Sequence, residues 1–283
     1  MGFLVGIATA LAQSLQNTYL RKIPEVPALQ LNWLRFSVAA VVSALLVSVF
    51  YTWFIPPFRF WAIVVLSVPL ELALTFCYVR SFQLSPQSLV GPLFSLSAIF
   101  LVPISYFLNQ ELPSLLGILG ILSVLIGALG LGWDFQNPGV RSSVINIFHA
   151  RGSRYMLGAA FGAGVSVAFA KYAYRYSPPL LFAFWVLTGL AIVHAPLALR
   201  KPLAHLRDQK KNALLATSFY SVGQALHYIG INLTLAAYFI SFKRLSIVFD
   251  VLLGKLSGGD THFRERLAGA VLMTIGVILI AFG

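Results

Sequence analysis

The chain alternates between long apolar runs and short stretches that hold proline, glycine and charged residues. A helix that crosses a membrane needs about 20 mostly apolar residues, and the runs have about this length. The interruptions mark where one run ends and the next begins. The pattern predicts ten helices, near residues 3–20, 28–50, 60–82, 87–108, 112–133, 154–176, 179–199, 212–234, 236–257 and 265–282.

The composition excludes an ordinary soluble protein. Of the 283 residues, 59% are hydrophobic and 10% are charged, whereas a soluble domain carries charge on about a quarter of its residues. Ten spans of about 20 residues use about 200 positions and leave no room for a separate soluble domain. The first helix carries Gln13, Gln16 and Asn17 and follows no basic stretch, so we expect a retained helix rather than a cleaved signal.

The two halves of the chain are similar at a constant shift of 152 residues. Coincidence explains the leucine and alanine matches, but not a proline, a tryptophan and two glycines in one ungapped register. These four matches are Pro27 with Pro179, Trp33 with Trp185, Gly6 with Gly158 and Gly117 with Gly269. The similarity predicts a first five-helix repeat over 1–133, a connector over 134–153 and a second five-helix repeat over 154–283.

Five helices is an odd number, so the second repeat must enter the membrane in the opposite orientation to the first. Inverted repeats surround a pseudo-two-fold axis in the membrane plane, and a central site can then open alternately to either side. The expected fold class is an all-α membrane protein with ten transmembrane helices in two inverted five-helix repeats. This arrangement favours a transporter over a channel or an enzyme.

Short motifs point to one family. They are Asn32-Trp33-Leu34-Arg35-Phe36, Asn109-Gln110-Glu111 ahead of Gly117, Gly120 and Gly127, Ser241-Phe242-Lys243-Arg244-Leu245-Ser246, and Arg264-Glu265-Arg266-Leu267-Ala268-Gly269. Over essentially its whole length the chain resembles the EamA-type members of the drug/metabolite transporter superfamily. It departs from the family pattern at Gly258-Gly259-Asp260, where a Gly-Glu pair is usual. The resemblance implies a permease or exporter of small metabolites, with a cavity built from the third, fourth, eighth and ninth helices.

Glu71 lies at the centre of the third predicted helix, where its short side chain cannot reach water at either face. An ionisable group at this depth is costly and marks a candidate site. Thr75 and Tyr78 follow four and seven residues later, so they share its helix face. This stripe either lines a substrate cavity or makes a fixed hydrogen bond or ion pair.

A second polar stripe runs along the eighth predicted helix, with Tyr220, Gln224 and His227. His227 corresponds to Thr75 at the shift of 152 residues, so the two stripes occupy related positions. We expect Gln224 and His227 either to contact substrate or to serve only as satisfied hydrogen-bonding groups.

The ninth predicted helix carries Lys243, Arg244 and Asp250 among apolar residues. Lys243 and Asp250 are seven residues apart and share a helix face. The two cations either extend to the interface or pair across the bundle with Glu71. We expect Glu71 within reach of one of them, so that a substrate can compete with the internal pair.

Pro92 follows Gly91 in the fourth predicted helix, in the register of Lys243 and Arg244 in the ninth. Proline and glycine open the backbone ladder, and interrupted helices at related positions mark binding sites in transporters with inverted repeats. The alternative is that membrane helices simply tolerate proline and glycine. We include Pro92 in the candidate substrate site.

The chain contains no nucleotide-binding loop and no metal or catalytic motif. We therefore expect a secondary transporter that exports a small polar or amphipathic metabolite such as an amino acid, with no cofactor, metal or catalytic residue. The expected partners are the substrate, membrane lipids and a coupling proton or ion, and not nucleic acid, although the net charge is +12. The alternative is a membrane-embedded enzyme for a lipid or isoprenoid, for which Ser257 is the nearest nucleophile and lacks a nearby base.

Charge in the connectors predicts the orientation. Connectors after odd-numbered helices hold 14 Lys and Arg, and those after even-numbered helices hold 2. The positive-inside rule then places the odd connectors in the cytoplasm and both termini outside, whereas the family resemblance implies both termini inside. We adopt the charge count and expect a multi-pass protein of a bacterial plasma membrane.

Overall fold

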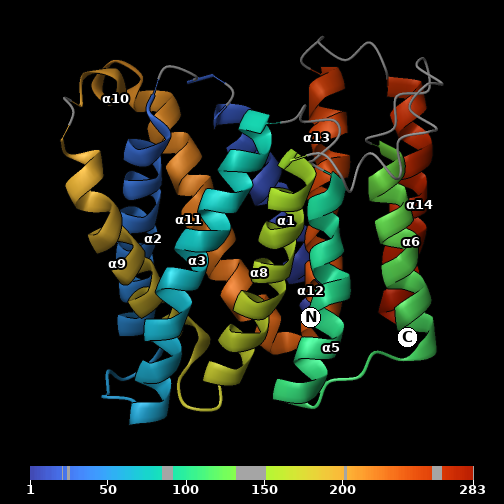
Figure 1. Cartoon of the computed structure of the whole chain (residues 1–283), viewed down its shortest axis with the longest axis horizontal. Helices are drawn as coiled ribbons and strands as arrows, with labels where there is room; N and C mark the ends of the chain where they lie inside the picture. The colour runs from blue at the N-terminus through green and yellow to red at the C-terminus, as the bar shows by residue number, and fades with distance from the viewer. Residues whose placement is uncertain are drawn as a thin grey trace. The chain divides into compact units, whose positions relative to one another are not determined.

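The computed structural model describes residues 1–20, 22–23, 26–84, 92–131, 151–200, 203–256 and 263–282. Every regular element in this part of the chain is a helix, which confirms the all-α prediction (Figure 1). The helices are α1 (Gly2–Leu20), α2 (Ala28–Phe50), α3 (Phe58–Leu84), η1 (Pro92–Leu96), α5 (Ser97–Asn109), α6 (Leu115–Leu131), α8 (Arg151–Ala173), α9 (Pro179–Ala198), α10 (Ala204–Asp208), α11 (Lys210–Leu233), α12 (Ala236–Lys243), α13 (Leu245–Leu256) and α14 (Phe263–Phe282).

Each predicted segment coincides with helical structure, usually within three residues at each end. The fourth predicted helix is observed as η1 followed by α5, and the ninth as α12 followed by α13. The short helix α10 was not predicted, because its five residues lie in a polar connector. Gly91 and the segment Ser257-Gly258-Gly259-Asp260 lie outside the described residues. The arrangement of ten helices as inverted repeats stays a prediction.

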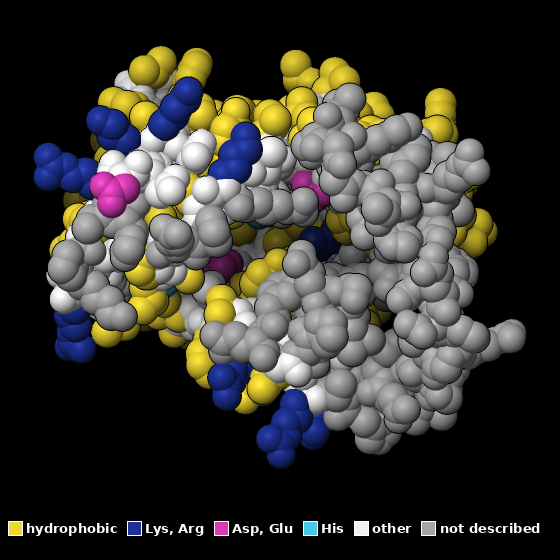
Figure 2. Space-filling view, turned by 90° about the horizontal axis from the view of Figure 1, so that it is seen from above, with side chains coloured by type: hydrophobic (Ala, Val, Ile, Leu, Met, Phe, Trp, Pro, Cys, Tyr) yellow, Lys and Arg dark blue, Asp and Glu magenta, His cyan; other side chains and the backbone are white. Residues whose placement is uncertain are grey.

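Four described helices are long and apolar enough to cross a membrane: Ala28–Phe50, Phe58–Ser81, Arg151–Ala173 and Pro179–Ala198. On α2 the exposed side chains of Val41, Leu45 and Val49 follow one another at four-residue intervals. They form one exposed apolar helix face, as expected for a helix that contacts lipid. Figure 2 shows hydrophobic side chains projecting from the described helices. These features support an integral membrane protein.

The chain divides into two compact units, which are described separately. Unit 1 comprises Met1–Val68 and Ala170–Thr234, and unit 2 comprises Pro69–Phe169 and Leu235–Gly283. Each unit combines segments from both halves of the sequence, so the units are not the predicted repeats. Helices α3 and α8 each contribute to both units.

In unit 1, α1 packs antiparallel against α11. Gly2, at the start of α1, lies against Thr234 just beyond the end of α11, and Gly223 lies against Ala12 near the middle. A Cβ added to Gly2 would approach the Thr234 Cβ to 2.8 Å. The missing side chain therefore allows the two helix ends to meet closely.

The other main contact in unit 1 joins α2 and α9, which are also antiparallel. Gln30 Nε2 near the start of α2 donates to the Ala198 carbonyl at the end of α9, at 3.2 Å. Val47 near the end of α2 packs with Leu180 and Leu181 at the start of α9. The hydrogen bond and the apolar cluster thus fix opposite ends of this helix pair.

In unit 2, α6 and α14 run side by side through contacts between glycines (Figure 1). A Cβ added to Gly120 would lie 2.6 Å from the Gly276 carbonyl oxygen, and one added to Gly127 would lie 2.7 Å from the Gly269 carbonyl oxygen. Small residues at these positions let the two backbones approach closely. Gly120 and Gly127 therefore serve the close packing of α6 and α14.

Candidate functional site

Glu71 is the ionisable residue of α3 on which the candidate site depends. It is partly buried, and Ser166 Oγ of α8 donates a hydrogen bond to its carboxylate. Small residues of α8 make this approach possible, since Gly158 faces Cys77 and Gly162 faces Leu74 on α3. The α3–α8 contact therefore brings a hydroxyl donor to the acid inside unit 2.

Lys243 is the cation whose charge acts on the Glu71 carboxylate. It is the last residue of α12 and is partly buried. Burial makes a charge costly at both positions, and the opposite charges of Glu71 and Lys243 offset part of this cost. That Glu71 and Lys243 form an internal pair with which a substrate competes stays a prediction.

Arg244 makes different contacts, to the junction of η1 and α5. Its Nη2 donates to the Phe94 carbonyl at 3.2 Å and to Ser97 Oγ at 2.5 Å. The guanidinium also lies over the Phe94 ring, 4.7 Å from its centroid. Tyr78 packs edge-on against the same ring, with centroids 5.2 Å apart. Arg244 therefore joins α12 to α5 in this conformation.

The ninth predicted helix is interrupted near its middle, which the sequence did not predict. The helix α12 ends at Lys243 and α13 begins at Leu245, with the Ile247 amide donating to the Arg244 carbonyl at 3.0 Å. This bond spans three residues and tightens the backbone at Arg244. In the fourth predicted helix, Pro92 begins the 3₁₀ helix η1, which continues as α5.

The predicted site residues divide between the two units. Gln224 and His227 lie on α11 in unit 1, and the His227 ring packs against Tyr228 with centroids 5.5 Å apart. Unit 2 contains Glu71, Thr75, Tyr78, Pro92, Lys243, Arg244 and Asp250. Thr75 is partly buried one turn after Glu71, and Asp250 is partly buried on α13. Their roles in substrate binding stay predictions, as do those of Gln224 and His227.

Glu111, which had no predicted role, connects the segment between α5 and α6 to α12. Its Oε2 accepts a hydrogen bond from Ser105 Oγ at 2.7 Å and another from the Ala236 backbone amide at 3.1 Å. Ala236 is the first residue of α12, where backbone amides lack helical partners and negative charge is favourable. Glu111 therefore caps the helix that ends in Lys243.

The neighbouring residues of this motif also have structural roles. Asn109 Nδ2 donates to the Ala168 carbonyl of α8 at 3.2 Å, and Gln110 ends α5 in a left-handed conformation with φ of 59°. The motif Asn109-Gln110-Glu111 thus connects α5, α8 and α12 inside unit 2. Its partners are too far away along the sequence to be recognised from spacing.

Chemically, the cluster formed by Glu71, Ser166, Lys243 and Arg244 offers one acid and two cations. The described residues include no group of three or more His, Cys, Asp or Glu that could hold a metal ion. Such a cluster can bind a small molecule through complementary charges. A carboxylate would suit the cations, and an amine would suit Glu71.

Comparisons with known proteins are consistent with these features. Residues 150–282 match the EamA-like transporter family, within the drug/metabolite transporter superfamily, which confirms the resemblance over this part of the chain. One solved crystal structure of a protein has a TM-score of 0.75 at 17% sequence identity and covers 99% of this chain and 96% of its own, which shows a shared fold. The comparison with curated proteins gives no match.

Proposed function

We propose that this protein is a secondary transporter of a small polar or amphipathic metabolite such as an amino acid. The match of residues 150–282 to the EamA-like transporter family supports this proposal. In this proposal it works by alternating access in a plasma membrane and exports its substrate. A proton or ion gradient, or the substrate's own gradient, supplies the energy.

The observation that carries the proposal is the charged cluster of unit 2. Ser166 donates a hydrogen bond to Glu71, and Lys243 supplies an opposite charge that acts on it. The helix that carries Lys243 is interrupted at Arg244. Charged groups inside a membrane protein are costly unless they have a partner, and they usually mark a substrate or ion pathway. An amino acid would supply a carboxylate to Lys243 and an amine to Glu71. The attraction between Glu71 and Lys243 would then be replaced by two interactions with the substrate.

The packing of the helices supports the inverted repeat on which alternating access depends. The shift of 152 residues relates α2 to α9 and α6 to α14, and each of these helix pairs packs antiparallel. Val124 and Gly276 differ by this shift, and a Cβ added to Gly276 would lie 2.7 Å from the Val124 backbone nitrogen. Contact between equivalent residues is what a two-fold axis between two copies produces.

Counterflow in proteoliposomes tests the proposal. Vesicles containing the protein are loaded with unlabelled amino acids, organic cations or sugar phosphates and supplied with the labelled compound. We expect exchange of an amino acid by the parent and at least about tenfold slower exchange by Glu71→Gln, which corresponds to 1.4 kcal/mol. Arg151→Gln, an exposed change at the start of α8, should match the parent.

A matched serine pair tests the contact to Glu71 itself. Ser166→Ala removes a donor to a charged group, which is worth about 1.5 kcal/mol, and should slow exchange about tenfold. Ser14→Ala changes a buried serine of α1 and should exchange like the parent. If the parent moves none of the three classes of compound, the proposed function is wrong. If it moves one while Glu71→Gln behaves like the parent, the site is wrong but transport stands.

A further inference from the structure

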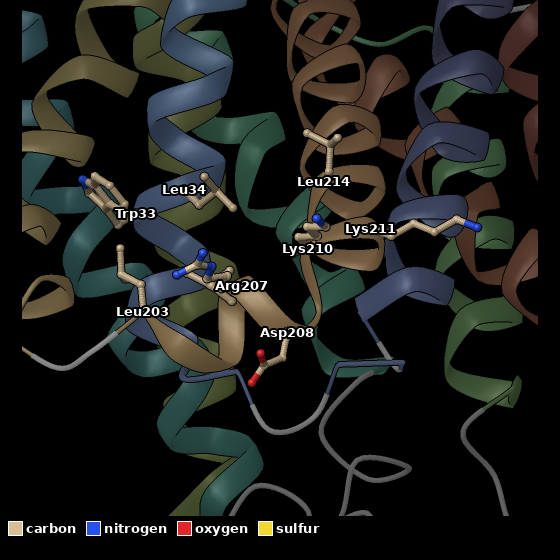
Figure 3. A pocket seen from close by; sticks show the side chains of 10 residues that line it. Trp33, Leu34, Leu203, Arg207, Asp208, Lys210, Lys211 and Leu214 are labelled. Atoms are coloured by element: carbon tan, nitrogen blue, oxygen red, sulfur yellow. The ribbon is translucent and has the colours of Figure 1, made fainter.

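A cleft in unit 1 lies apart from the charged cluster and has no role in the proposed function. It has a volume of about 1210 Å³, larger than the 300–1000 Å³ typical of small-molecule pockets. Its lining residues are Trp33, Leu34, Leu203, Leu206, Arg207, Asp208, Lys210, Lys211, Ala213 and Leu214 (Figure 3). They come from α2, from α10 with the residue before it, and from α11.

The cleft lies where helices of unit 1 end. The helices α2 and α11 both begin there, and α9 ends there, because the start of α2 is hydrogen-bonded to the last residue of α9. Ends of membrane-spanning helices lie near the bilayer surface, where tryptophan is enriched. Trp33, one turn into α2, has the position of such an interfacial residue.

The floor and sides of the cleft are apolar. Leu206 and Ala213 are buried and form a hydrophobic cluster with Ile23 and Val26, against which Leu34 packs. This cluster anchors α10 on the starts of α2 and α11. Acyl chains could lie on such a surface, whereas a water-soluble anion would gain nothing from it.

The rim of the cleft is basic. Arg207, Lys210 and Lys211 are exposed, and their side chains make no hydrogen bond or ion pair within the described part of the chain. Asp208 is the one acid among the lining residues. In Figure 3, Lys211 extends away from the other labelled side chains, which leaves Arg207 and Lys210 as the cations next to the apolar side chains.

We propose that this cleft binds an anionic phospholipid, with the acyl chains against Trp33, Leu34 and Leu214 and the headgroup phosphate at Arg207 and Lys210. The combination of an apolar floor and basic rim selects a lipid over free phosphate. Juxtamembrane Lys and Arg attract anionic headgroups, each contributing about a fivefold gain in affinity. The site is independent of the substrate site in unit 2, so it can be tested without a known substrate.

Native mass spectrometry of the full chain in detergent measures the binding. Phosphatidylglycerol and phosphatidylcholine with identical acyl chains are titrated in parallel. We expect phosphatidylglycerol to bind more tightly, and R207Q/K210Q to weaken this binding about 25-fold. The loss should be smaller for phosphatidylcholine, because the choline group already compensates the charge of its phosphate. The control R151Q removes an exposed arginine of unit 2 and should bind both lipids like the parent.

A second variant and a soluble probe keep the test decisive. Leu214→Ser changes a side chain that is 62% exposed, so it should fold, and it should weaken binding of both lipids by removing an acyl contact. Glycerol phosphate without acyl chains should not compete. Equal binding of the two lipids by the parent, unchanged binding by R207Q/K210Q or by Leu214→Ser, or effective competition by glycerol phosphate would each overturn the lipid site.

Discussion

The α1–α11 pair of unit 1 and the α3–α8 pair of unit 2 have the same construction. In both pairs the helices are antiparallel, and a glycine of one helix lies against the other helix. A Cβ added to Gly223 would lie 3.5 Å from Ala12 in the first pair, and one added to Gly162 would lie 3.5 Å from Leu74 in the second. The shift of 152 residues relates α1 to α8 and α3 to α11, so the pairs are equivalent in the proposed duplication.

The two pairs differ at the position of the acid. At the same shift Glu71 corresponds to Gly223, and Ser166 corresponds to Ser14. The first pair therefore keeps the serine but has no acid beside it. Small residues therefore set the helix packing in both pairs. The exchange of one residue, together with the cation Lys243, distinguishes the charged site from a purely structural contact.

Placing an acid in the first pair should lower the stability of the protein more than any other change considered. Gly223→Glu would put a carboxylate against Ala12, where the residue corresponding to Lys243 is Gly91. We expect the free energy of unfolding to fall by about 3 kcal/mol, the cost of an unmatched charge in a membrane helix. Denaturant unfolding in detergent measures this change, with Gly223→Ala as the control. A Gly223→Glu variant as stable as its control would show that the first pair can neutralise an acid.

A double-mutant cycle should show that the acid of the second pair depends on its cation. Glu71→Gln leaves Lys243 without a compensating charge and should lower the free energy of unfolding by about 2 kcal/mol, less than for a fully buried pair. Adding Lys243→Met should recover about half of this loss. The same unfolding assay, applied to both single variants and the double variant, gives the coupling. Strictly additive losses would mean that the two charges do not stabilise each other.

Alanine at the two glycines should have the smallest effect and the same sign in both pairs. Gly162→Ala and Gly223→Ala each add a methyl at ordinary contact distance and should raise the free energy of unfolding by up to about 0.5 kcal/mol, because alanine favours helix. Gly164→Ala is the control, since its Cβ would lie 3.1 Å from the Leu101 backbone nitrogen and should be destabilising. If thermal unfolding shows that one of the first two variants is stabilised and the other destabilised, the two pairs are not equivalent.

The helices could be predicted because their evidence is local. An apolar run of the right length specifies a membrane helix without knowledge of its neighbours. The interruption between α12 and α13 was not predicted, because the run over 236–257 is apolar on both sides of Lys243 and Arg244. The compact units could not be predicted, because they depend on which helices pack together over long sequence separations. The hydrogen bond from Gln30 to Ala198, for example, spans 168 residues.

The candidate site was predictable only in part, for a similar reason. Glu71 was evident because an acid at the centre of an apolar helix is rare and costly. Its partner Ser166 was not, since a serine among Gly162, Ala163 and Gly164 looks like another small packing residue. Glu111 was recognised as part of a motif but not as a helix cap, because Ala236 follows it by 125 residues.

The cap at Glu111 also has a consequence for the order of biosynthesis. The helix α12 has eight residues, and a helix of this length is unstable in isolation. Its N-terminal amide finds its acceptor in a carboxylate synthesised 125 residues earlier. During translation, Glu111 is therefore synthesised before the segment of α12 leaves the ribosome. The helix α12 can then form against helices of the first half that have already entered the membrane.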